Sequence, residues 1–382
     1  MDAIKGTINM QIPAAKIYFP EEDRKELLKQ IDGILESGQL TLGKYGKEFE
    51  ERFAAYVGTK YAIAVNSGTS ALEIPLRALD VKGHSVIVPT NTFFATPASV
   101  IHAGGEVVFA DVTENLCIDP ESVKENIRKD TKGIIVVHIG GIIPPQVKAI
   151  QEICEDRGLF LIEDAAHAHG STLGGKMAGS FGDAAAFSFY PTKVMTSGEG
   201  GMITTDDKKI YERALVFRDQ GKAGFYGNVH TEMGYNWRMS EIHAAIGLSQ
   251  FARLEEFIRD RRSVAKIYDE ELKEISGVTP IKIPSDAESN YYKYVALLDD
   301  GSIDRAAIKK ELREKYGVGL SGEVYELPCH LQPIFKDMYG FKEEEFPVAE
   351  DVCKRQICLP VFATMTEEQA KYVVDSLKEV LK

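Results

Sequence analysis

The sequence predicts an α/β protein with a large domain, in which a mainly parallel seven-stranded sheet lies between helices, and a smaller C-terminal α+β domain. Between about residues 60 and 206, short runs with strand character alternate with helical patterns. Continuous apolar strands separated by helices are typical of a parallel sheet that is covered on both faces. With 382 residues, the chain is long enough for one large and one small domain.

The predicted elements follow one another in a regular order. Helical patterns at residues 21–37 and 45–57 precede the sheet. The predicted strands occupy residues 61–65, 85–88, 107–111, 133–139, 159–163, 184–190 and 202–205. Helix-like stretches lie between several of them, at residues 70–79, 120–128 and 145–157. Because ligands of such sheets bind at the carboxyl ends of the strands, the residues that follow each strand are the place to search for chemistry.

The last third of the chain has a different pattern. Residues 239–275 read as long amphipathic helices with charged residues on the solvent side. A strand and two helices follow, at residues 292–298, 305–316 and 366–381. We therefore expect a large domain with N-terminal helices over residues 1–250 and a small domain over residues 251–382.

Composition and charge exclude several classes of protein. Hydrophobic residues make up 44% of the chain and charged residues 27%, which is ordinary for a globular protein. The formal net charge of −13 opposes non-specific binding to nucleic acid or to an anionic membrane. A local basic pocket could still bind an anionic substrate. No apolar run approaches the roughly 18 residues of a membrane span, and the N-terminus lacks the pattern of a signal peptide. We expect a cytoplasmic protein.

The cysteines predict neither a disulfide framework nor a zinc site. They are odd in number, and no two of them have the Cys-x-x-Cys spacing. The five positions are Cys117, Cys154, Cys329, Cys353 and Cys358.

The most informative stretch is residues 183–201, where a small apolar strand runs into a turn that carries Lys193 and then into a glycine-rich loop. A lysine at the end of a buried strand is costly if its amine stays charged and unpaired. The arrangement makes chemical sense if the amine forms an imine with an aldehyde cofactor, which indicates pyridoxal 5'-phosphate (PLP). The alternative is a surface lysine, as most lysines are.

A carboxylate that suits the same cofactor follows another predicted strand. Asp164 comes directly after residues 159–163, so it lies at the carboxyl end of that strand. A carboxylate there can keep the pyridine nitrogen of PLP protonated, which lets the ring accept electrons. The alternative is an aspartate that caps a helix or a turn.

A phosphate site is predicted where the strand at residues 61–65 gives way to a helix. Gly68 lets the backbone approach a ligand, while Thr69 and Ser70 add hydroxyls to the free N–H groups of the helix start. Ser188, on the strand before Lys193, could add another hydroxyl. The same pattern also makes ordinary helix caps. Dinucleotide and Walker-type glycine patterns are absent from this stretch.

Four stretches, in this order, resemble the DegT/DnrJ/StrS-type sugar aminotransferases. The combination is specific, although no single piece is, and the similarity covers most of the chain. It ends with a family-like Leu359-Pro and, a few residues later, Met365-Thr-Glu-Glu. The four stretches are Ser67-Gly-Thr-Ser-Ala71, Glu163-Asp-Ala-Ala-His-Ala-His-Gly170, Phe187-Ser-Phe-Tyr-Pro-Thr-Lys-Val-Met-Thr-Ser-Gly-Glu-Gly-Gly201 and Gly234-Tyr-Asn-Trp-Arg-Met-Ser240.

The resemblance implies a PLP fold type I homodimer that aminates keto groups of nucleotide-linked sugars. Lys193 would form the imine with PLP and Asp164 would pair with the pyridinium, while Thr69, Ser70 and Ser188 would hold the phosphate. Asn236 would reach the phosphate from the other subunit, so that each site needs two chains. The presence of a lysine at position 193 excludes the family's dehydratase branch, which has histidine there.

The resemblance also assigns residues near the ring and the substrate. His167 would lie near the ring face or its hydroxyl. Phe93 would stack on the pyridine, although a phenylalanine after a strand is more often a core residue. Arg238 would help to place the phosphate or the substrate. Apart from the resemblance, a diphosphate needs cations, and Arg218, Lys222 and Arg238 are candidates after the lysine segment; the alternative is solvated surface charge. Two departures from the family pattern, the loop at residues 138–145 and Tyr190, could shape substrate choice.

The implied mechanism has two halves. An amino acid donor, which we expect to be L-glutamate, leaves its amine on the cofactor as pyridoxamine phosphate, and a keto sugar then takes it up. Lys193 would move the proton in both halves. Because one amine must serve as both acid and base, its pKa must lie well below the ordinary value, lowered by burial and by nearby positive charge.

Three alternatives remain open from the sequence. Glu163, Asp164, His167 and His169 could be read as the ligands of a metal hydrolase. A related transaminase could act on a cyclic ketone without a nucleotide, of the aminocyclitol or aminobenzoate type. A non-catalytic, PLP-binding regulatory protein would also keep the motifs.

Overall fold

The computed structural model describes residues 10–224, 228–299 and 301–382, and it confirms the predicted α/β class. The central sheet has seven strands in the order β1-β9-β8-β5-β4-β2-β3. Only β9 runs antiparallel to its neighbours, so the sheet is mainly parallel, as predicted. The strands are β1 (Tyr61–Val65), β2 (Ser85–Pro89), β3 (Glu106–Ala110), β4 (Thr131–Val137), β5 (Phe160–Asp164), β8 (Ala184–Ser188) and β9 (Gly201–Thr205).

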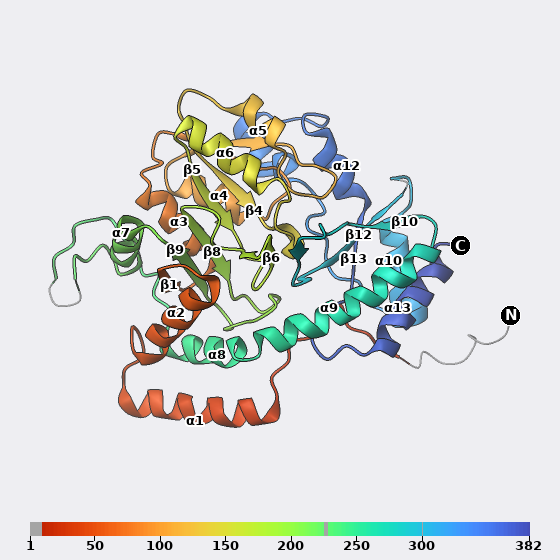
Figure 1. Ribbon diagram of the computed structural model, residues 1–382, viewed down its shortest axis with the longest axis horizontal. Coiled ribbons are helices and arrows are strands. Elements are labelled where there is room, and N and C mark those ends of the chain that lie inside the picture. The colour runs from red at the N-terminus through yellow and green to blue at the C-terminus, as the bar shows by residue number, and fades with distance from the viewer. Residues whose placement is uncertain (1–9, 225–227, 300) are drawn as a thin grey trace.

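Helices cover both faces of this sheet (Figure 1). On one face lie α3 (Gly68–Ala78), α4 (Ala95–His102) and α7 (Lys208–Arg218). On the other lie α2 (Lys44–Val57), α5 (Pro120–Asn126) and α6 (Val147–Arg157). Because both faces are covered, the strands are buried along almost their whole length, which explains why they read as continuous apolar runs.

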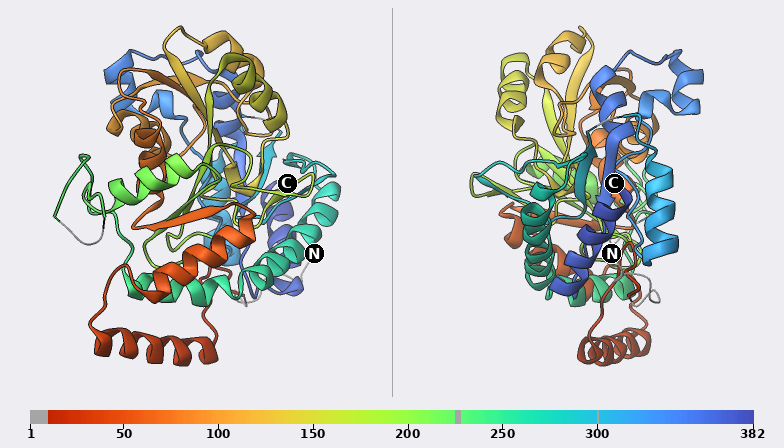
Figure 2. Two further views of the ribbon diagram at one scale, coloured as in Figure 1. Left: turned by 60° about the vertical axis from the view of Figure 1, so that its left-hand side comes forward. Right: turned by 90° about the vertical axis from the view of Figure 1, so that its right-hand side faces the viewer.

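Two helices extend from this layered body. The helix α1 (Glu21–Ser37) packs beside α8 (Glu241–Phe251), and both views of Figure 2 show it at the edge of the molecule. Of its residues only Ile34 is buried. After α8, the long helix α9 (Leu254–Glu271) runs from the large sheet to the C-terminal part of the chain (Figure 1).

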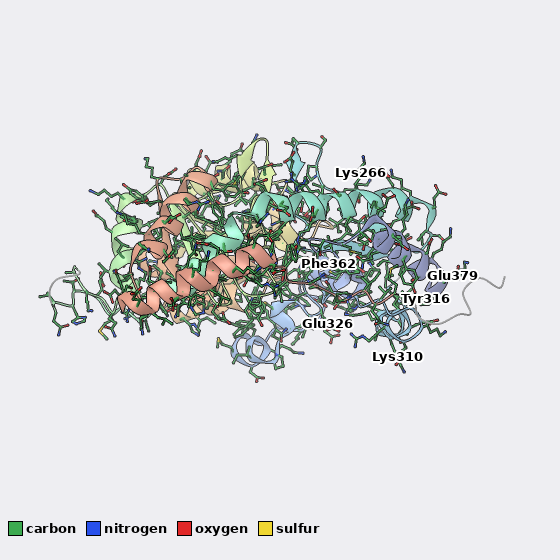
Figure 3. The ribbon with its side chains drawn as sticks, turned by 90° about the horizontal axis from the view of Figure 1, so that it is seen from below. Lys266, Lys310, Tyr316, Glu326, Phe362 and Glu379 are labelled. Atoms are coloured by element: carbon green, nitrogen blue, oxygen red, sulfur yellow. The ribbon has the colours of Figure 1, made fainter. Side chains whose placement is uncertain are left out.

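A second core lies in the C-terminal part. A three-stranded antiparallel sheet is formed by β10 (Val278–Pro280), β12 (Tyr294–Leu298) and β13 (Gln356–Leu359). It packs with α9, α10 (Arg305–Tyr316) and α13 (Glu367–Val380), and Phe362, which Figure 3 labels, is among the buried side chains of this core. The helix α13 starts at a capping box, in which Thr366 and Gln369 satisfy each other's backbone N–H groups.

Two segments cross the predicted division at residue 250. Ile12, from the N-terminal part, packs in the C-terminal core and pairs with Val318. In the other direction, α11 (Pro333–Tyr339) and α12 (Pro347–Arg355) pack beside β3, where Phe109 contacts Phe335. Each part of the chain therefore contributes residues to the core of the other part. The division into residues 1–250 and 251–382 stays a prediction.

Several shorter elements were not predicted. Besides α4, α7, α11, α12, β10 and β13, they include a small sheet of β6 (Thr172–Leu173), β7 (Lys176–Met177) and β11 (Ala287–Glu288). No helix in the described part of the chain is both long and apolar enough to span a membrane.

Candidate active site

The residues singled out by the sequence meet at one edge of the large sheet. The strands β1, β2, β4, β5 and β8 run in the same direction, because β9 is the only reversed strand between them. Their carboxyl ends therefore lie along the same edge. That edge carries the start of α3 after β1, Phe93 after β2, Asp164 at the end of β5, and Lys193 after β8.

Lys193 lies in the turn after β8, with its N–H bonded to the carbonyl of Tyr190 at 2.9 Å. Its ammonium lies 4.9 Å from the centroid of the Tyr292 ring and makes no ion pair with the residues that the structure describes. Burial lowers the pKa of Lys193 to about 8. The Asp164 carboxylate acts in the opposite direction and raises this pKa, while the Lys293 ammonium lowers it further. The alternative of an ordinary surface lysine is wrong.

Asp164 is the last residue of β5, and its carboxyl group is buried. One oxygen accepts a hydrogen bond from the Thr96 hydroxyl at 2.7 Å, and the other accepts from the N–H of Ala166 at 3.2 Å. Burial raises the pKa of Asp164, while these two hydrogen bonds and the Lys193 ammonium act in the opposite direction. A buried carboxylate whose remaining lone pairs are free is a suitable partner for a cation, such as a protonated ring nitrogen.

His167 is held from three sides. Its ring stacks on Tyr292 with centroids 4.2 Å apart. Its Nδ1 accepts a hydrogen bond from the N–H of Gly140 at 3.3 Å, so the proton of the neutral ring belongs on Nε2, which lies 3.3 Å from the Tyr325 hydroxyl. Burial, followed by the charges of Lys193 and Lys293, holds the pKa of His167 well below its ordinary value, so the ring is neutral.

The start of α3 has the features of an anion site. The helix begins at Gly68, with Ser67 as its N-cap, so the N–H groups of Gly68 and Thr69 are left without partners inside the helix. A Cβ on Gly68 would lie 2.7 Å from the Cβ of Ser188, which brings the two predicted segments into direct contact. The hydroxyl of Ser70 is bonded to Asn66 at 2.8 Å and to the Ser67 carbonyl at 2.9 Å, so it also braces the loop.

Phe93 lies in the turn between β2 and α4. Its side chain is 56% exposed, so the alternative of a core phenylalanine is wrong. Its ring lies 5.7 Å from that of Tyr325, which places it on the side of the site that Tyr325 and His167 share. Stacking of Phe93 on a cofactor ring stays a prediction.

The predicted residues of the 234–240 stretch lie close to the anion site. The carbonyl of Asn236 accepts a hydrogen bond from the Asn66 amide at 3.4 Å, and its own side chain is exposed. Arg238 forms an ion pair with Asp219.

The two other candidate cations are also engaged within the chain. Lys222 lies 3.8 Å from Asp219. Arg218 is buried, where it binds Glu50 at 2.5 Å and the Ala64 carbonyl at 3.1 Å, so its charge is neutralised inside the fold.

Sequence reasoning missed the wall of the site that comes from the C-terminal part. The amide of Asn290 donates to the carbonyls of His167 and His169, both at 2.9 Å. It thereby fixes Tyr292 and Lys293 beside Lys193. These residues lie about a hundred positions beyond the lysine in a loop without a local motif, and only the three-dimensional fold brings them together. Thr96 and Tyr325 were missed for the same reason.

The side chains of the alternative metal site do not converge. The carboxylate of Glu163 accepts hydrogen bonds from the N–H groups of Gly179, Phe181 and Gly182 and contacts the His138 ring at 2.7 Å. The ring of His169 packs between Phe187 and Phe189. In the described ranges, no group of three His, Cys, Asp or Glu side chains is arranged to hold a metal ion.

Comparison with known proteins places this geometry in context. The model of the DegT/DnrJ/EryC1/StrS aminotransferase family matches residues 21–378. The spore coat polysaccharide biosynthesis protein SpsC of Bacillus subtilis (strain 168) is 36% identical over 372 residues, covering 94% of this chain and 95% of SpsC. The GDP-perosamine synthase of Escherichia coli O157:H7 is 35% identical over 366 residues, covering 95% of this chain and 97% of the synthase.

Two further similarities bear on the cofactor and on the alternatives. The protein Spr1654 of Streptococcus pneumoniae, named as a proposed sugar aminotransferase and solved in a PLP form and a PMP form, has a TM-score of 0.90 at 27% identity. The match covers 97% of this chain and 98% of Spr1654. A relative from Geobacillus stearothermophilus, 36% identical over 375 residues, covering 97% of this chain and 98% of the relative, is named a pleiotropic regulatory protein.

Proposed function

Since the chain belongs to the DegT/DnrJ/EryC1/StrS aminotransferase family, we propose that it transfers an amino group from L-glutamate to a keto group of a nucleotide-linked sugar with the help of PLP. The observation that carries the proposal is the pair of Lys193 and Asp164. An amine that has no ion-pair partner among the described residues and a buried carboxylate lie at the carboxyl edge of the sheet, where ligands of such folds bind. A nucleotide-linked acceptor is supported by the names of three relatives, a GDP-perosamine synthase, a transaminase named for a dTDP-linked amino sugar and an aminotransferase named for a UDP-linked sugar.

The residues present fit the cofactor. The N–H groups of Gly68 and Thr69, with the hydroxyl of Ser188, form a cradle for a phosphate, and the contact between Gly68 and Ser188 leaves no room for a Cβ. Asp164 would hold a protonated ring nitrogen, and Phe93 and His167 would border the ring. When bound, PLP would supply an aldehyde that binds amines and a ring that withdraws electrons from the carbon next to the amine.

The protein's own part in the chemistry is proton transfer. Once a substrate amine has displaced it, the Nζ of Lys193 would take a proton from the donor's α-carbon and deliver it to the cofactor within the first half of the reaction. In the second half the same amine would move a proton in the reverse direction, to the carbon of the acceptor. A pKa of about 8 lets this amine serve as base and as acid near neutral pH, which an ordinary lysine cannot do. The neutral ring of His167 adds no charge that would compete with this titration.

The pH dependence of imine formation tests this picture. An amine reacts with an aldehyde only in its neutral form, so the yield of PLP attached to Lys193 of the cofactor-free protein is expected to rise with pH through about 8. At pH 7 roughly a tenth of the amine is already neutral. The measurement is the mass gain at Lys193 after borohydride reduction at each pH. A rise centred on the ordinary lysine value of about 10.5 would contradict the proposed environment.

The proposed reaction is tested by supplying the PLP-loaded protein with L-glutamate and a panel of keto-sugar nucleotides and keto-inositols. We expect 2-oxoglutarate and an amino-sugar nucleotide in equal amounts. Turnover of a keto-inositol in place of the nucleotides would indicate the cyclic-ketone alternative. Half-turnover with glutamate alone, seen as loss of the yellow absorption, would show the amino transfer even before the acceptor is known.

A second candidate function rests on the relative that is named a pleiotropic regulatory protein. A protein of that kind could bind PLP without turning over a keto sugar. The assay with L-glutamate and the panel of keto substrates distinguishes this function from transamination, because turnover with any keto sugar excludes a purely regulatory role.

We further propose that the active protein is a homodimer with shared sites. The support is the exposed side chain of Asn236, which lies next to the anion site yet makes no hydrogen bond of its own within the described part of the chain. Light scattering with size-exclusion chromatography measures the mass of the assembly. A monomer of 42.3 kDa with full activity would contradict the proposal.

For location, we propose the cytoplasm. All five cysteines are buried and free, which is typical of proteins in reducing compartments. Fractionation of the source cells with an antibody to the protein would test this.

A further inference from the structure

Lys293 is a cationic residue to which the proposed mechanism assigns no role. It lies just before β12, and its N–H donates to the carbonyl of Gly140 at 3.1 Å, in the loop after β4. The residue is therefore anchored at the same sheet edge as Lys193. Its ammonium lies 5.4 Å from the centroid of the Tyr292 ring, and the ammonium of Lys193 lies 4.9 Å from that same centroid.

No acidic group in the described part of the chain forms an ion pair with Lys293. The titratable groups around it are the thiol of Cys358, whose pKa is raised to about 12 by burial, and three charged groups. These are Arg261 from α9, Lys309 from α10 and Glu323 from the loop after α10. Glu323 is the only acid among them, and it is already bound to Lys309 at 2.7 Å and 3.0 Å. The Lys293 side chain is thus half-buried among neighbours that are mostly positive, and its burial lowers the pKa of its ammonium.

The other groups of the site cannot take over the role of a free cation. His167 is neutral because of its burial, and the guanidinium of Arg261 donates to the carbonyls of Tyr291 and Val361. The amine of Lys193 would be joined to the cofactor when a substrate first binds and would move the proton afterwards, so it does not stay a free cation through the reaction. Lys293 then remains the cation beside the reacting centre, and a half-buried cation without a counterion favours a site for an anion.

We propose that Lys293 is a binding residue for an anionic group of a substrate, which its ammonium contacts directly beside the reacting centre. This inference rests on the proposed transamination. The anion has two possible sources with the same chemistry, a carboxylate of the amino acid donor or the diphosphate of the acceptor. Both would form a charge-assisted hydrogen bond with the ammonium.

The test is Lys293→Met in the PLP-loaded protein, with Lys293→Gln as a second variant. In a reaction with two halves, kcat/KM for each substrate reports only on its own half. The two values of kcat/KM therefore distinguish a contact with the donor's carboxylate from a contact with the acceptor's diphosphate. We expect a fall of about tenfold to a hundredfold in kcat/KM for one substrate, with the other changed less than about threefold. A fall for glutamate assigns the carboxylate, and a fall for the sugar nucleotide assigns the diphosphate.

A matched control is Lys266→Met, the same change at an exposed position of α9 (Figure 3). It is expected to leave both constants unchanged. Calorimetric titration with 2-oxoglutarate and with a nucleoside diphosphate gives a readout that does not depend on turnover, and one dissociation constant should rise by a similar factor.

If kcat/KM of the Lys293 variants falls equally for both substrates, or falls for neither, the inference is overturned. Equal falls together with a shifted pH profile would show instead that Lys293 acts only through the amine of Lys193. If the unchanged protein turns over no keto substrate at all, the proposed function fails, which is a different result. Thermal unfolding of each variant confirms that the comparison is made on folded protein.

Discussion

Replacing Lys193 with alanine is expected to abolish transamination, lowering kcat by about a thousandfold or more. The reason is that Lys193 is the only lysine among the main charges that act on the Asp164 carboxylate in the described chain, and proton transfer by a positioned group is worth about a hundredfold to ten-thousandfold by itself. The loss of covalent attachment adds to this effect. The variant should fold normally, because the Lys193 ammonium forms no ion pair within the described residues and its burial opposes its charge.

Steady-state turnover and the mass gain after borohydride measure this prediction together. Lys193→Ala should show neither turnover nor a PLP-derived mass at position 193, while the control Lys266→Ala should show both. A Lys193→Ala protein that keeps a normal rate would remove the basis of the proposed chemistry, since another group would then have to move the proton.

Replacing Asp164 with asparagine is expected to lower kcat by about a hundredfold or more. The amide keeps the shape of the side chain but carries no charge, so it cannot hold a protonated ring nitrogen. The change also acts on Lys193. The carboxylate raises the pKa of that amine, so its removal should move the pKa of Lys193 below the value of about 8. Hence the pH at which imine formation is half-maximal should fall in the variant.

Thr96→Val is the matched comparison for Asp164→Asn. It removes the hydrogen bond of 2.7 Å to the carboxylate but leaves the charge, so we expect a loss of less than about tenfold. If Asp164→Asn lost no more activity than Thr96→Val, the charge of Asp164 would not matter, and its role would be confined to the turn that it forms with Ala166.

The parts of the fold and the site that could be predicted are those with local signals. Asp164 ends a buried strand, and Gly68 and Lys193 lie within five residues after one, so the rule that ligands bind at the carboxyl ends of strands applies to all three positions. The seven strands were found because both faces of the sheet are covered. The helix α4 escaped prediction because it has only 8 residues, too few for an apolar pattern of helical period to stand out.

What could not be predicted depends on contacts between distant segments. Nothing near Arg218 in the sequence shows that its charge is met by Glu50, 168 positions away. In the same way, Asn290 holds the backbone of His167 across 123 positions, and this bond decides which face the C-terminal loop presents to Lys193. A sequence pattern reports the neighbours along the chain, whereas the electrostatics of the site come from neighbours in space.

The bond between Asn290 and the loop after β5 has a consequence for how such enzymes can diverge. One side of the site belongs to the first two-thirds of the chain, and the side with Tyr292 and Lys293 belongs to the last third. A crossover between related genes near α9 would exchange the second side as a block and leave the lysine, the aspartate and the phosphate cradle untouched. Hybrid proteins of this kind offer a direct route to new acceptors without loss of the chemistry.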